Sequence, residues 1–427
     1  MSRKWTFTYS SVTFVFIYVC RNFVIAESPA FGSSTVQTIL SNGHPETVFD
    51  LVLLGEGYTA SELNKFEADV ARVTSEGFGP GGIYFSISPF LNIHSIFEAS
   101  EESGVGMDGK PLNTVFRLFR EKGKLRSILP SDENNFSYDK ALKMCKLANV
   151  PGCDVAIILV NDPFYGGLGD EVAILSASKS TGMISMRHEL GHIFADIGEE
   201  YDGGDDYSGA NFALTNRLCT DEDKPKKISF DGGVTREVWE CISWSQWLTS
   251  VPKQNDANIP VEDITMLYMK HPWKAFDRAA YSDTFKSAGE ATFFRFEFSL
   301  SGAVGPGKVF LSVDEKNINE FPLPIDNDRH FFHYDSKNQP LTKGVHRFSL
   351  FLQQLSKPSD AIPRHGPATI SHVGIWEYGE DFEKRIGYVG AFPVFEKPGV
   401  VKGYRPVDNS CLMRSMATMR RGLLCRN

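Results

Sequence analysis

The segment HELGH at positions 188–192 constrains the chain strongly. It places His188, Glu189 and His192 in the pattern HExxH. On a helix, residues four positions apart lie one turn above each other, so the two imidazoles face the same side. Imidazole nitrogens and a carboxylate suit one zinc ion, and three protein ligands leave a position open for water. We therefore predict a zinc-binding helix, with Glu189 as the general base that acts on this water.

Apolar residues on the same helix predict that it is anchored in a core. They recur at helical spacing and are Leu190, Ile193, Phe194 and Ile197. The two histidines lie to one side of this stripe, as a helix that lines a cleft requires. Gly198 follows and is the expected helix stop. The alternative interpretation is a solvated helix whose two histidines bind nothing.

A third ligand is expected from the acidic residues that follow Gly198. Metzincin-type zinc peptidases take theirs six residues after the second histidine, and here that residue is Gly198, which has no side chain. A turn longer by one residue would deliver Glu199, which is therefore our first choice. Glu200 is the second choice, and a more distant residue such as Asp202 or His271 is the third. An acidic patch without any ligand is the alternative.

Three further blocks share a pattern with one known family. They are VFDLVLLGEGYTASELNKFEADV at 48–70, DVAIILVNDPFYGGLGDEVAILS at 154–176 and GYRPVDNSCLMR at 403–414. Together with HELGH and the following Glu199-Glu200-Tyr201, they resemble the IgA-peptidase-type family of secreted zinc metallopeptidases, a metzincin-like group. Family members usually have Asp at the position of Glu199, so this chain keeps the carboxylate and adds a methylene. The resemblance does not cover residues 265–385.

The resemblance implies a metzincin-like zincin fold of the α/β (α+β) class, with a mixed sheet beside the HExxH helix. By position in the family pattern, Met413 is the methionine of a turn beneath the zinc. In such folds an edge strand over the cleft can pair with an extended substrate, and here we expect residues 171–176 to form it. An ordinary internal strand at 171–176 is the alternative. The implied activity is a secreted zinc endopeptidase that hydrolyses protein or peptide substrates.

Alternating strand and helix patterns also predict an α/β layer with a mixed sheet. Thr59 and Glu62 form a capping box at the start of a helix. The strands are expected at residues 48–54, 90–97, 155–160 and 171–176, and the helices at about 59–76 and 138–147.

From about residue 285 the pattern changes to short alternating strands. Phe294, Phe296 and Phe298 alternate with polar residues, and Gly305-Pro306-Gly307 marks a turn. Several such strands predict a β-sandwich-like module inserted into the catalytic domain. We divide the chain into a signal peptide at 1–26, a catalytic domain at 27–264, the β insert at 265–385 and a C-terminal return with the methionine turn at 386–427.

The first 26 residues have the features of a secretory signal. Arg3 and Lys4 precede a mostly apolar run at 11–20, and Val24 and Ala26 fit the cleavage rule. A mitochondrial presequence or an uncleaved tail is the alternative. We expect a secreted, extracellular protein with no membrane attachment after cleavage. Its formal charge of −9, with no basic stripe, argues against nucleic acid as a partner.

The cysteines fit an extracellular chain. Cleavage would remove Cys20 and leave six, an even set that is typical of disulfides in secreted proteins. A glycosylation sequon at Asn135-Phe-Ser137 predicts a glycoprotein. Six cysteines allow 15 pairings by count. Of these we choose the nearest-neighbour scheme, Cys145–Cys153, Cys219–Cys241 and Cys411–Cys425.

Two other functions compete with the peptidase. The first is a non-catalytic secreted binding protein on a peptidase scaffold, which would act through the β module. The second is zinc-dependent hydrolysis of a bond other than a peptide bond. The intact motif favours an enzyme, because a pure binder has no use for Glu189.

Overall fold

A computed structural model describes the chain between residues 34 and 414. The predicted signal peptide at 1–26 and the sequon residue Asn135 lie outside the described residues, so both stay predictions. The gaps within the described part are 122–123, 132–135, 148–151, 170–171, 205–206, 215–225, 231–233, 239–241, 245–246, 250–260, 277–279, 338, 355–367, 381, 383–387, 409–410 and 412.

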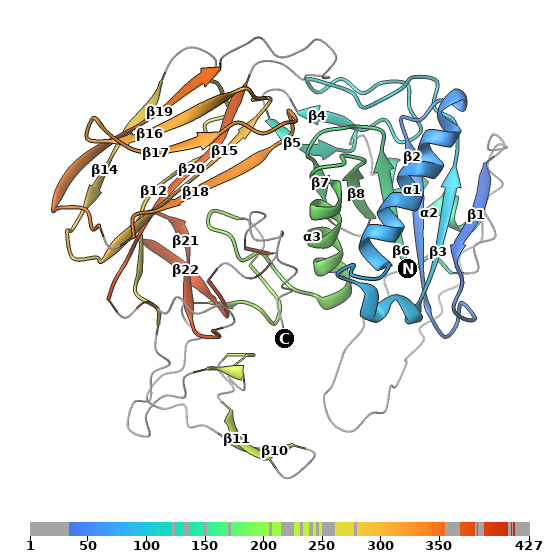
Figure 1. Cartoon of the computed structure of the whole chain (residues 1–427). Coiled ribbons are helices and arrows are strands. Elements are labelled where there is room, and N and C mark those ends of the chain that lie inside the picture. The colour runs from blue at the N-terminus through green and yellow to red at the C-terminus, as the bar shows by residue number, and fades with distance from the viewer. Residues whose placement is uncertain are drawn as a thin grey trace. The chain divides into compact units, whose positions relative to one another are not determined.

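A six-stranded mixed sheet forms the centre of the first part of the chain (Figure 1). Its order is β1-β3-β2-β6-β8-β7. The four inner strands are parallel, and β1 and β7 are antiparallel edges. The inner strands are almost wholly buried, as expected for strands that are covered on both faces. The strands are β1 (Thr35–Leu40), β2 (Phe49–Glu56), β3 (Leu91–Phe97), β6 (Val155–Val160), β7 (Gly167–Leu168) and β8 (Val172–Ser176).

Helices cover both faces of this sheet (Figure 1). The helices α1 and α3 pack on one face, where Phe66 and Leu190 share a core with Leu53 of β2. Helix α2 packs on the other face, where Met144 shares a core with Ile158 of β6. No helix in the described part is both long and apolar enough to span a bilayer. The helices are α1 (Leu63–Phe78), α2 (Phe136–Leu147) and α3 (Gly182–Ala195), with short 3-10 turns η1 (Ala60–Glu62) and η2 (Phe85–Phe90).

Most local predictions for this part are confirmed. The strands expected at 48–54, 90–97 and 155–160 are β2, β3 and β6, and the helix expected at 138–147 is α2. The capping box is also present, and the backbone N–H of Thr59 donates to the Glu62 carboxylate at 2.9 Å. These elements follow from local patterns of hydrophobicity and capping.

The prediction that residues 171–176 form the edge strand is wrong. Strand β8 lies inside the sheet, between β6 and β7, and Leu175 pairs with Gly167 of β7. The glycine-rich segment before β8 folds back and adds β7 as a two-residue antiparallel edge. The sequence pattern marked this segment as a turn, because two residues are too few to show strand periodicity.

The predicted helix stop at Gly198 is also wrong. Helix α3 ends at Ala195, and Asp196 adopts the left-handed conformation, with φ of 49°. Asp tolerates this conformation better than most residues do. Gly198 is required for another reason, because a Cβ there would collide with the backbone of Ser208.

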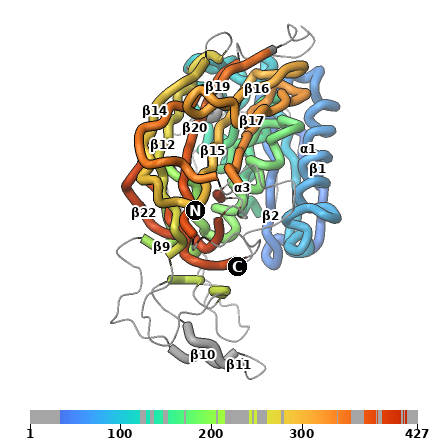
Figure 2. The backbone as a smooth tube through the Cα atoms, turned by 60° about the vertical axis from the view of Figure 1, so that its left-hand side comes forward, coloured from blue at the N-terminus to red at the C-terminus, as the bar shows by residue number. Residues whose placement is uncertain are grey.

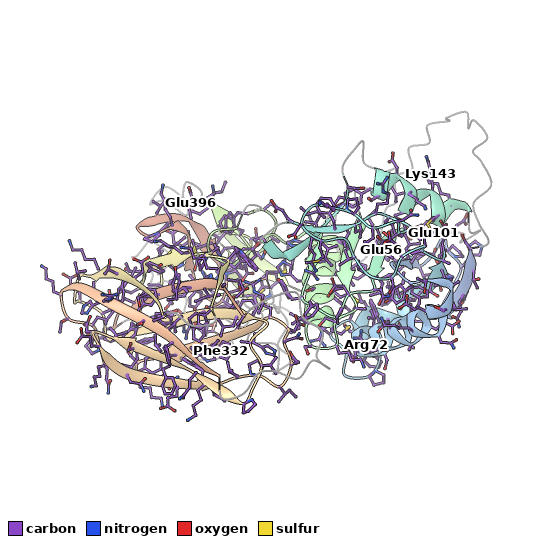
Figure 3. All side chains as sticks on the ribbon, turned by 90° about the horizontal axis from the view of Figure 1, so that it is seen from above. Glu56, Arg72, Glu101, Lys143, Phe332 and Glu396 are labelled. Carbon is purple, nitrogen blue, oxygen red and sulfur yellow. A yellow bond between two sulfur atoms is a disulfide. The ribbon has the colours of Figure 1, made fainter. Side chains whose placement is uncertain are left out.

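Two antiparallel sheets form a β-sandwich after residue 263 (Figures 1 and 2). Their facing side chains share one core, in which Phe296 and Phe298 of β15 meet Phe348 of β19. Phe332, labelled in Figure 3, stacks on Phe298 with ring centroids 4.8 Å apart. The first sheet holds β12 (Ile264–Lys270), β13 (Lys274–Ala275), β15 (Phe293–Ser301), β18 (His330–Asp335) and β20 (Thr369–Tyr378). The second holds β14 (Tyr281–Ser287), β16 (Gly307–Val313), β17 (Lys316–Pro322) and β19 (Gly344–Gln354).

The last strands return to the segment that follows α3. Strand β22 pairs both with β21 and with β9, so residues 400–405 lie beside residues 213–214. These strands are β9 (Ala213–Leu214), β21 (Phe392–Lys397) and β22 (Val400–Arg405). Two separate hairpins are β4 (Phe119–Glu121) with β5 (Lys124–Leu129), and β10 (Lys226–Phe230) with β11 (Val234–Val238).

One predicted disulfide is confirmed, between Cys145 and Cys153. Cys411 is also disulfide-bonded, and Cys219, Cys241 and Cys425 lie outside the described residues. The predicted pairs Cys219–Cys241 and Cys411–Cys425 therefore stay predictions. In the sequon, Ser137 is buried and its hydroxyl donates to the carbonyl of Phe116 at 2.8 Å.

Candidate metal centre

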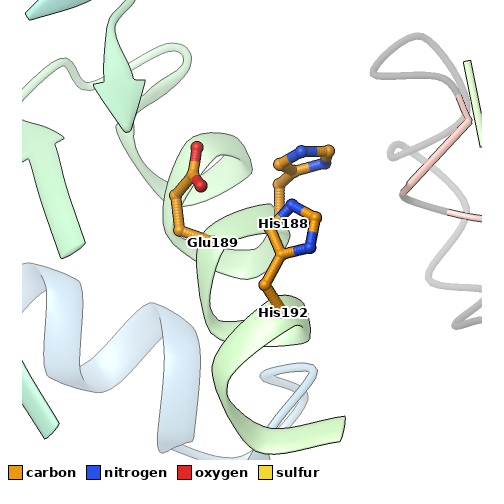
Figure 4. Close-up of side chains that lie close together, drawn as sticks. All are labelled: His188, Glu189 and His192. Carbon is orange, nitrogen blue, oxygen red and sulfur yellow. The ribbon is translucent and has the colours of Figure 1, made fainter. Parts of the chain in front are cut away.

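The two histidines of the HExxH motif lie one turn apart on α3, with Glu189 beside them (Figure 4). Their ring centroids are 4.9 Å apart. Potential ligand atoms of His188, Glu189 and His192 all lie within 4.8 Å of one another. His188 is buried and His192 is half-buried. Among the described residues, this is the one group of three or more His, Cys, Asp or Glu side chains whose potential ligand atoms lie this close together.

Glu199 reaches the two histidines from the loop after α3. Its Oε1 lies 3.2 Å from Nε2 of His188 and 3.5 Å from Nε2 of His192. Zinc binds such nitrogen and oxygen atoms at about 2.0–2.2 Å in tetrahedral geometry, which sets neighbouring ligand atoms about 3.4 Å apart. Both distances from Oε1 of Glu199 to the histidine nitrogens therefore fit ligands of a single zinc ion.

The hydrogen bonds at these residues also fit a metal site. Nδ1 of His192 donates to the carbonyl of Ile197 at 2.6 Å. In a neutral imidazole this bond leaves Nε2, which faces Glu199, as the free lone pair. Oε2 of Glu199 is buried and forms no hydrogen bond with any described residue.

The ionisation of Glu199 suits a metal ligand as well. Burial raises its pKa, but the neighbouring side chains of His188 and His192 outweigh burial and lower the pKa to about 2. At neutral pH the side chain is therefore a carboxylate, which is the form that binds zinc.

The carboxylate of Glu189 lies against the glycine-rich backbone before β8. A Cβ at Gly167 would come within 3.2 Å of Oε1 of Glu189, and a Cβ at Gly169 would collide with its Oε2. Burial raises the pKa of Glu189, although the charges of His188 and His192 lower it in part. A buried carboxylate with a raised pKa accepts a proton more readily, as a general base must.

The alternative third ligands have other partners. Glu200 is fully buried, burial raises its pKa to about 7, and its Oε1 accepts a hydrogen bond from Asn211 at 2.9 Å. Asp202 accepts a hydrogen bond from Nε1 of Trp376 at 3.0 Å. The ring of His271 lies beside that of His372, with ring centroids 5.0 Å apart. Glu199, by contrast, lies within 3.5 Å of both histidines of the motif.

Asn211 fixes the loop that carries Glu199, although no sequence pattern predicted this role. Its Oδ1 accepts from the backbone N–H of Gly198 at 2.9 Å, and its Nδ2 donates to the Gly198 carbonyl at 2.8 Å. Both bonds hold the turn that aims Glu199 at the histidines. No local pattern marks Asn211, because it lies 12 positions beyond Glu199 and meets this turn only in the folded chain.

Met413 lies against the metal-binding helix. It is buried, and its sulfur is 3.2 Å from the place that a Cβ of Gly191 would occupy. Its carbonyl accepts a hydrogen bond from the N–H of Glu200 at 3.0 Å. Met413 therefore connects the end of the described chain both to α3 and to the loop of Glu199.

The comparison with protein families agrees with this geometry. Residues 38–216 match the family model described as IgA Peptidase M64. This match confirms the resemblance to IgA-peptidase-type metallopeptidases. The matched segment contains the whole mixed sheet except the first residues of β1, all three α-helices and Glu199, and it ends before the β-sandwich. It supports a peptidase, that is, a hydrolase.

No curated protein matches the chain. Among solved structures, the C-terminal CBM6 of LamC from Zobellia galactanivorans is 10% identical, covers 37% of this chain and 95% of its own, and has a TM-score of 0.18. The carbohydrate-binding module CBM6cm-2 of lichenase 5A from Cellvibrio mixtus is 8% identical, covers 39% of this chain and 95% of its own, and has a TM-score of 0.16. These scores are too low to support a conclusion about fold or ligand.

Proposed function

We propose that the chain is a secreted zinc-dependent endopeptidase with a metzincin-like catalytic fold. The observation that carries the proposal is the position of Glu199, whose Oε1 lies 3.2 and 3.5 Å from Nε2 of His188 and His192. This donor set lies on and just after the HExxH helix, within the segment that matches a peptidase family. In the proposed enzyme, His188, His192 and Glu199 hold one zinc ion.

When bound, zinc supplies a Lewis acid that polarises a peptide carbonyl. Glu189 does the proton chemistry in the proposed mechanism. Its carboxylate takes a proton from the attacking water and then hands it to the leaving amine. Its raised pKa favours this transfer, because a group with a pKa nearer to neutral can both accept and release a proton. Hydrogen bonding of His192 to Ile197 keeps that imidazole in the orientation that binding requires.

The proposed organisation has a signal peptide at 1–26, a catalytic domain at 27–264, a β-sandwich insert at 265–385 and a return to the catalytic domain at 386–427. The pairing of β22 with β9 supports the return, because it joins residues 400–405 to the segment after α3. Met413 against Gly191 supports a methionine turn beneath the site. The two-residue edge strand β7, in place of residues 171–176, is the proposed partner of an extended substrate.

Cleavage of a broad peptide library by the purified chain tests this function. The proposal expects internal cleavage that a chelator abolishes and that added zinc restores. The alternative, a secreted binding protein that acts through the β-sandwich, expects no cleavage by protein with a full complement of zinc. Zinc-dependent hydrolysis of another bond expects the same result in this assay, so absence of cleavage would overturn the peptidase proposal.

A further inference from the structure

The β-sandwich contacts the metal-binding segment at both of its ends. The first contact is made by Asp328, in the loop between β17 and β18, at the start of α3. The second is made by Trp376 of β20, through Asp202, in the loop that carries Glu199. All three proposed ligands lie between these two contacts along the chain.

Asp328 accepts hydrogen bonds from two segments that surround the site. Its Oδ2 accepts from the hydroxyls of Ser178 and Thr181, both at 2.6 Å, and its Oδ1 accepts from the backbone N–H of Tyr165 at 2.5 Å. Thr181 is the N-cap of α3, and Tyr165 lies two residues before the edge strand β7. One carboxylate therefore joins the start of the zinc helix to the backbone beside Glu189.

The chemistry of this contact favours a fixed geometry. Asp328 is only 3% exposed, and a buried carboxylate is costly unless donors surround it. Bonds to an ionised acceptor are shorter and about twice as strong as bonds between neutral groups. The negative charge also lies at the N-terminal end of a 14-residue helix, where the helix dipole favours it. The neighbouring Asp326 adds a bond from the hydroxyl of Ser180 at 2.8 Å.

At the other end, Asp202 collects three donors. Its carboxylate accepts from Nε1 of Trp376 at 3.0 Å, from the N–H of Phe395 at 2.8 Å and from the guanidinium of Arg414 at 3.0 Å. Trp376 is only 2% exposed and is anchored in the sandwich sheet. Because Asp202 lies three residues after Glu199, this cluster limits how far the Glu199 loop can move.

We propose that the β-sandwich is a brace that positions the metal ligands, with Asp328 and Trp376 as its positioning residues. The proposal rests on the proposed function, because it assigns these residues to the site formed by His188, His192 and Glu199. The brace does not touch substrate. It sets the relative position of helix α3 and the Glu199 loop, and thereby the affinity of the site for its metal.

The test compares Asp328→Asn and Trp376→Phe with two matched controls in the full chain. Asp314→Asn also removes a carboxylate from the sandwich, but among the described residues its carboxylate bonds to His346 and Arg347, both of the sandwich. Tyr281→Phe also removes an aromatic hydrogen-bonding group, but its partner Tyr268 lies in the sandwich. Each variant is measured at a temperature at which its circular dichroism shows it to be folded.

The first readout is zinc affinity, measured by competition with a chelator. Removing a partner that orients a ligand typically weakens metal binding by about 10–100-fold, and we expect this loss for Asp328→Asn and Trp376→Phe. Both controls should bind zinc as the unchanged chain does. On a peptide substrate with saturating zinc, kcat should fall while KM changes little. Unchanged zinc affinity in both test variants would overturn the proposal, even if their thermal stability fell.

The second readout needs neither zinc nor substrate. Hydrogen exchange of the metal-free chain should show faster exchange across 182–195 in Asp328→Asn and no change in Asp314→Asn. If the unchanged chain binds zinc but cleaves no peptide, the proposed peptidase function is refuted. The zinc affinities of the variants still test the brace proposal in that case. If the unchanged chain binds no zinc, the proposed metal site is refuted, and hydrogen exchange of the metal-free chain tests whether the sandwich holds helix α3. Equal hydrogen-exchange rates across 182–195 in Asp328→Asn and Asp314→Asn would then overturn the brace proposal.

A milder pair of variants covers the case in which Asp328→Asn does not fold. Thr181→Val removes one hydroxyl that donates to Asp328, and Thr181→Ser keeps it. The brace predicts weaker zinc binding in Thr181→Val and recovery in Thr181→Ser. A loss that is the same in both variants would not depend on the hydroxyl and would count against the brace.

Discussion

Oε1 of Glu199 lies 3.2 Å from Nε2 of His188, although the two residues are separated by the end of α3 and a tight turn. The turn is possible because Asp196 ends the helix in the left-handed conformation and Gly198 passes close to the backbone of Ser208. Asn211 then holds both the N–H and the carbonyl of Gly198. The resulting geometry separates the two neighbouring acidic residues after the helix, with Glu199 toward the histidines and Glu200 toward the interior.

The two glutamates should therefore respond differently to substitution. Glu199→Gln should weaken zinc binding by more than about 100-fold, because loss of a ligand costs more than loss of a partner that only orients one. Glu199→Asp should keep measurable zinc, since it keeps the carboxylate. Glu200→Gln serves as the matched control and should bind zinc normally. Chelator competition measures all three, and zinc loss in Glu200→Gln with retention in Glu199→Gln would reverse the assignment.

Glu189 should separate metal binding from catalysis. Glu189→Gln keeps the size of the side chain but cannot accept the proton from water. We expect kcat/KM to fall by about 10²–10⁴-fold, the usual contribution of a general base, while the zinc content stays at one ion per chain. Peptide cleavage and metal analysis on the same preparation test this. Retained activity in a zinc-loaded variant would show that another group moves the proton.

The glycines before β8 should control the position of Glu189. A Cβ at Gly169 would collide with Oε2 of Glu189, whereas a Cβ at Gly167 would make a tight contact of 3.2 Å with Oε1. Gly169→Ala should therefore reduce kcat/KM more than Gly167→Ala does, and both should retain zinc. Steady-state kinetics with zinc analysis gives the ranking. Equal and full activity in the two variants would show that the Glu189 carboxylate can move away at little cost.

The local part of the site was predictable, because it depends on spacing along one helix. The i and i+4 positions of His188 and His192 fix their common side, and the apolar stripe with Leu190 fixes the side of α3 that packs on the sheet. The ligand role of Glu199 remains a prediction that its geometry supports. A turn longer by one residue was enough to predict Glu199, because Gly198 has no side chain that could bind a metal.

The long-range parts of the fold could not be predicted from local patterns. The edge strand β7 is two residues long, so its pairing with β8 depends on the sheet rather than on its own composition. Asp328 lies 147 residues after Thr181 in a segment that is outside the family resemblance. Its sequence surroundings, Asp326-Asn-Asp, are typical of a surface turn. Only the folded chain brings this turn to the start of α3.

His346 should make the stability of the β-sandwich depend on pH. Burial lowers its pKa, but hydrogen bonds to Asp314 at 2.7 Å and to the carbonyl of Thr342 at 2.8 Å outweigh burial and raise the pKa above 6.5. The folded state then binds a proton more tightly than the unfolded state does. The stabilisation is full below pH 6.5 and is lost as the pH rises through the folded pKa.

His346→Gln should therefore lower the free energy of unfolding more at pH 5.5 than at pH 9. The difference should be about 1.4 kcal/mol for each unit by which folding raises the pKa. Urea unfolding at both pH values measures it, with His333→Gln, an exposed position on β18, as the control. An equal loss at the two pH values would mean that the bond to Asp314 does not depend on the charge of the imidazole.

Zinc should stabilise the folded chain through the same three ligands. An ion that binds only the folded state stabilises it by about 2.7 kcal/mol when its free concentration is 100 times its Kd. Thermal unfolding after chelator treatment, followed by a zinc titration, should show a midpoint that rises with zinc concentration. Glu199→Gln should lose this rise, and Glu189→Gln should keep it. Magnesium is the control ion, because it prefers six oxygen ligands and should leave the midpoint unchanged. A zinc-dependent rise of equal size in Glu199→Gln would place the ion elsewhere and would refute the donor set.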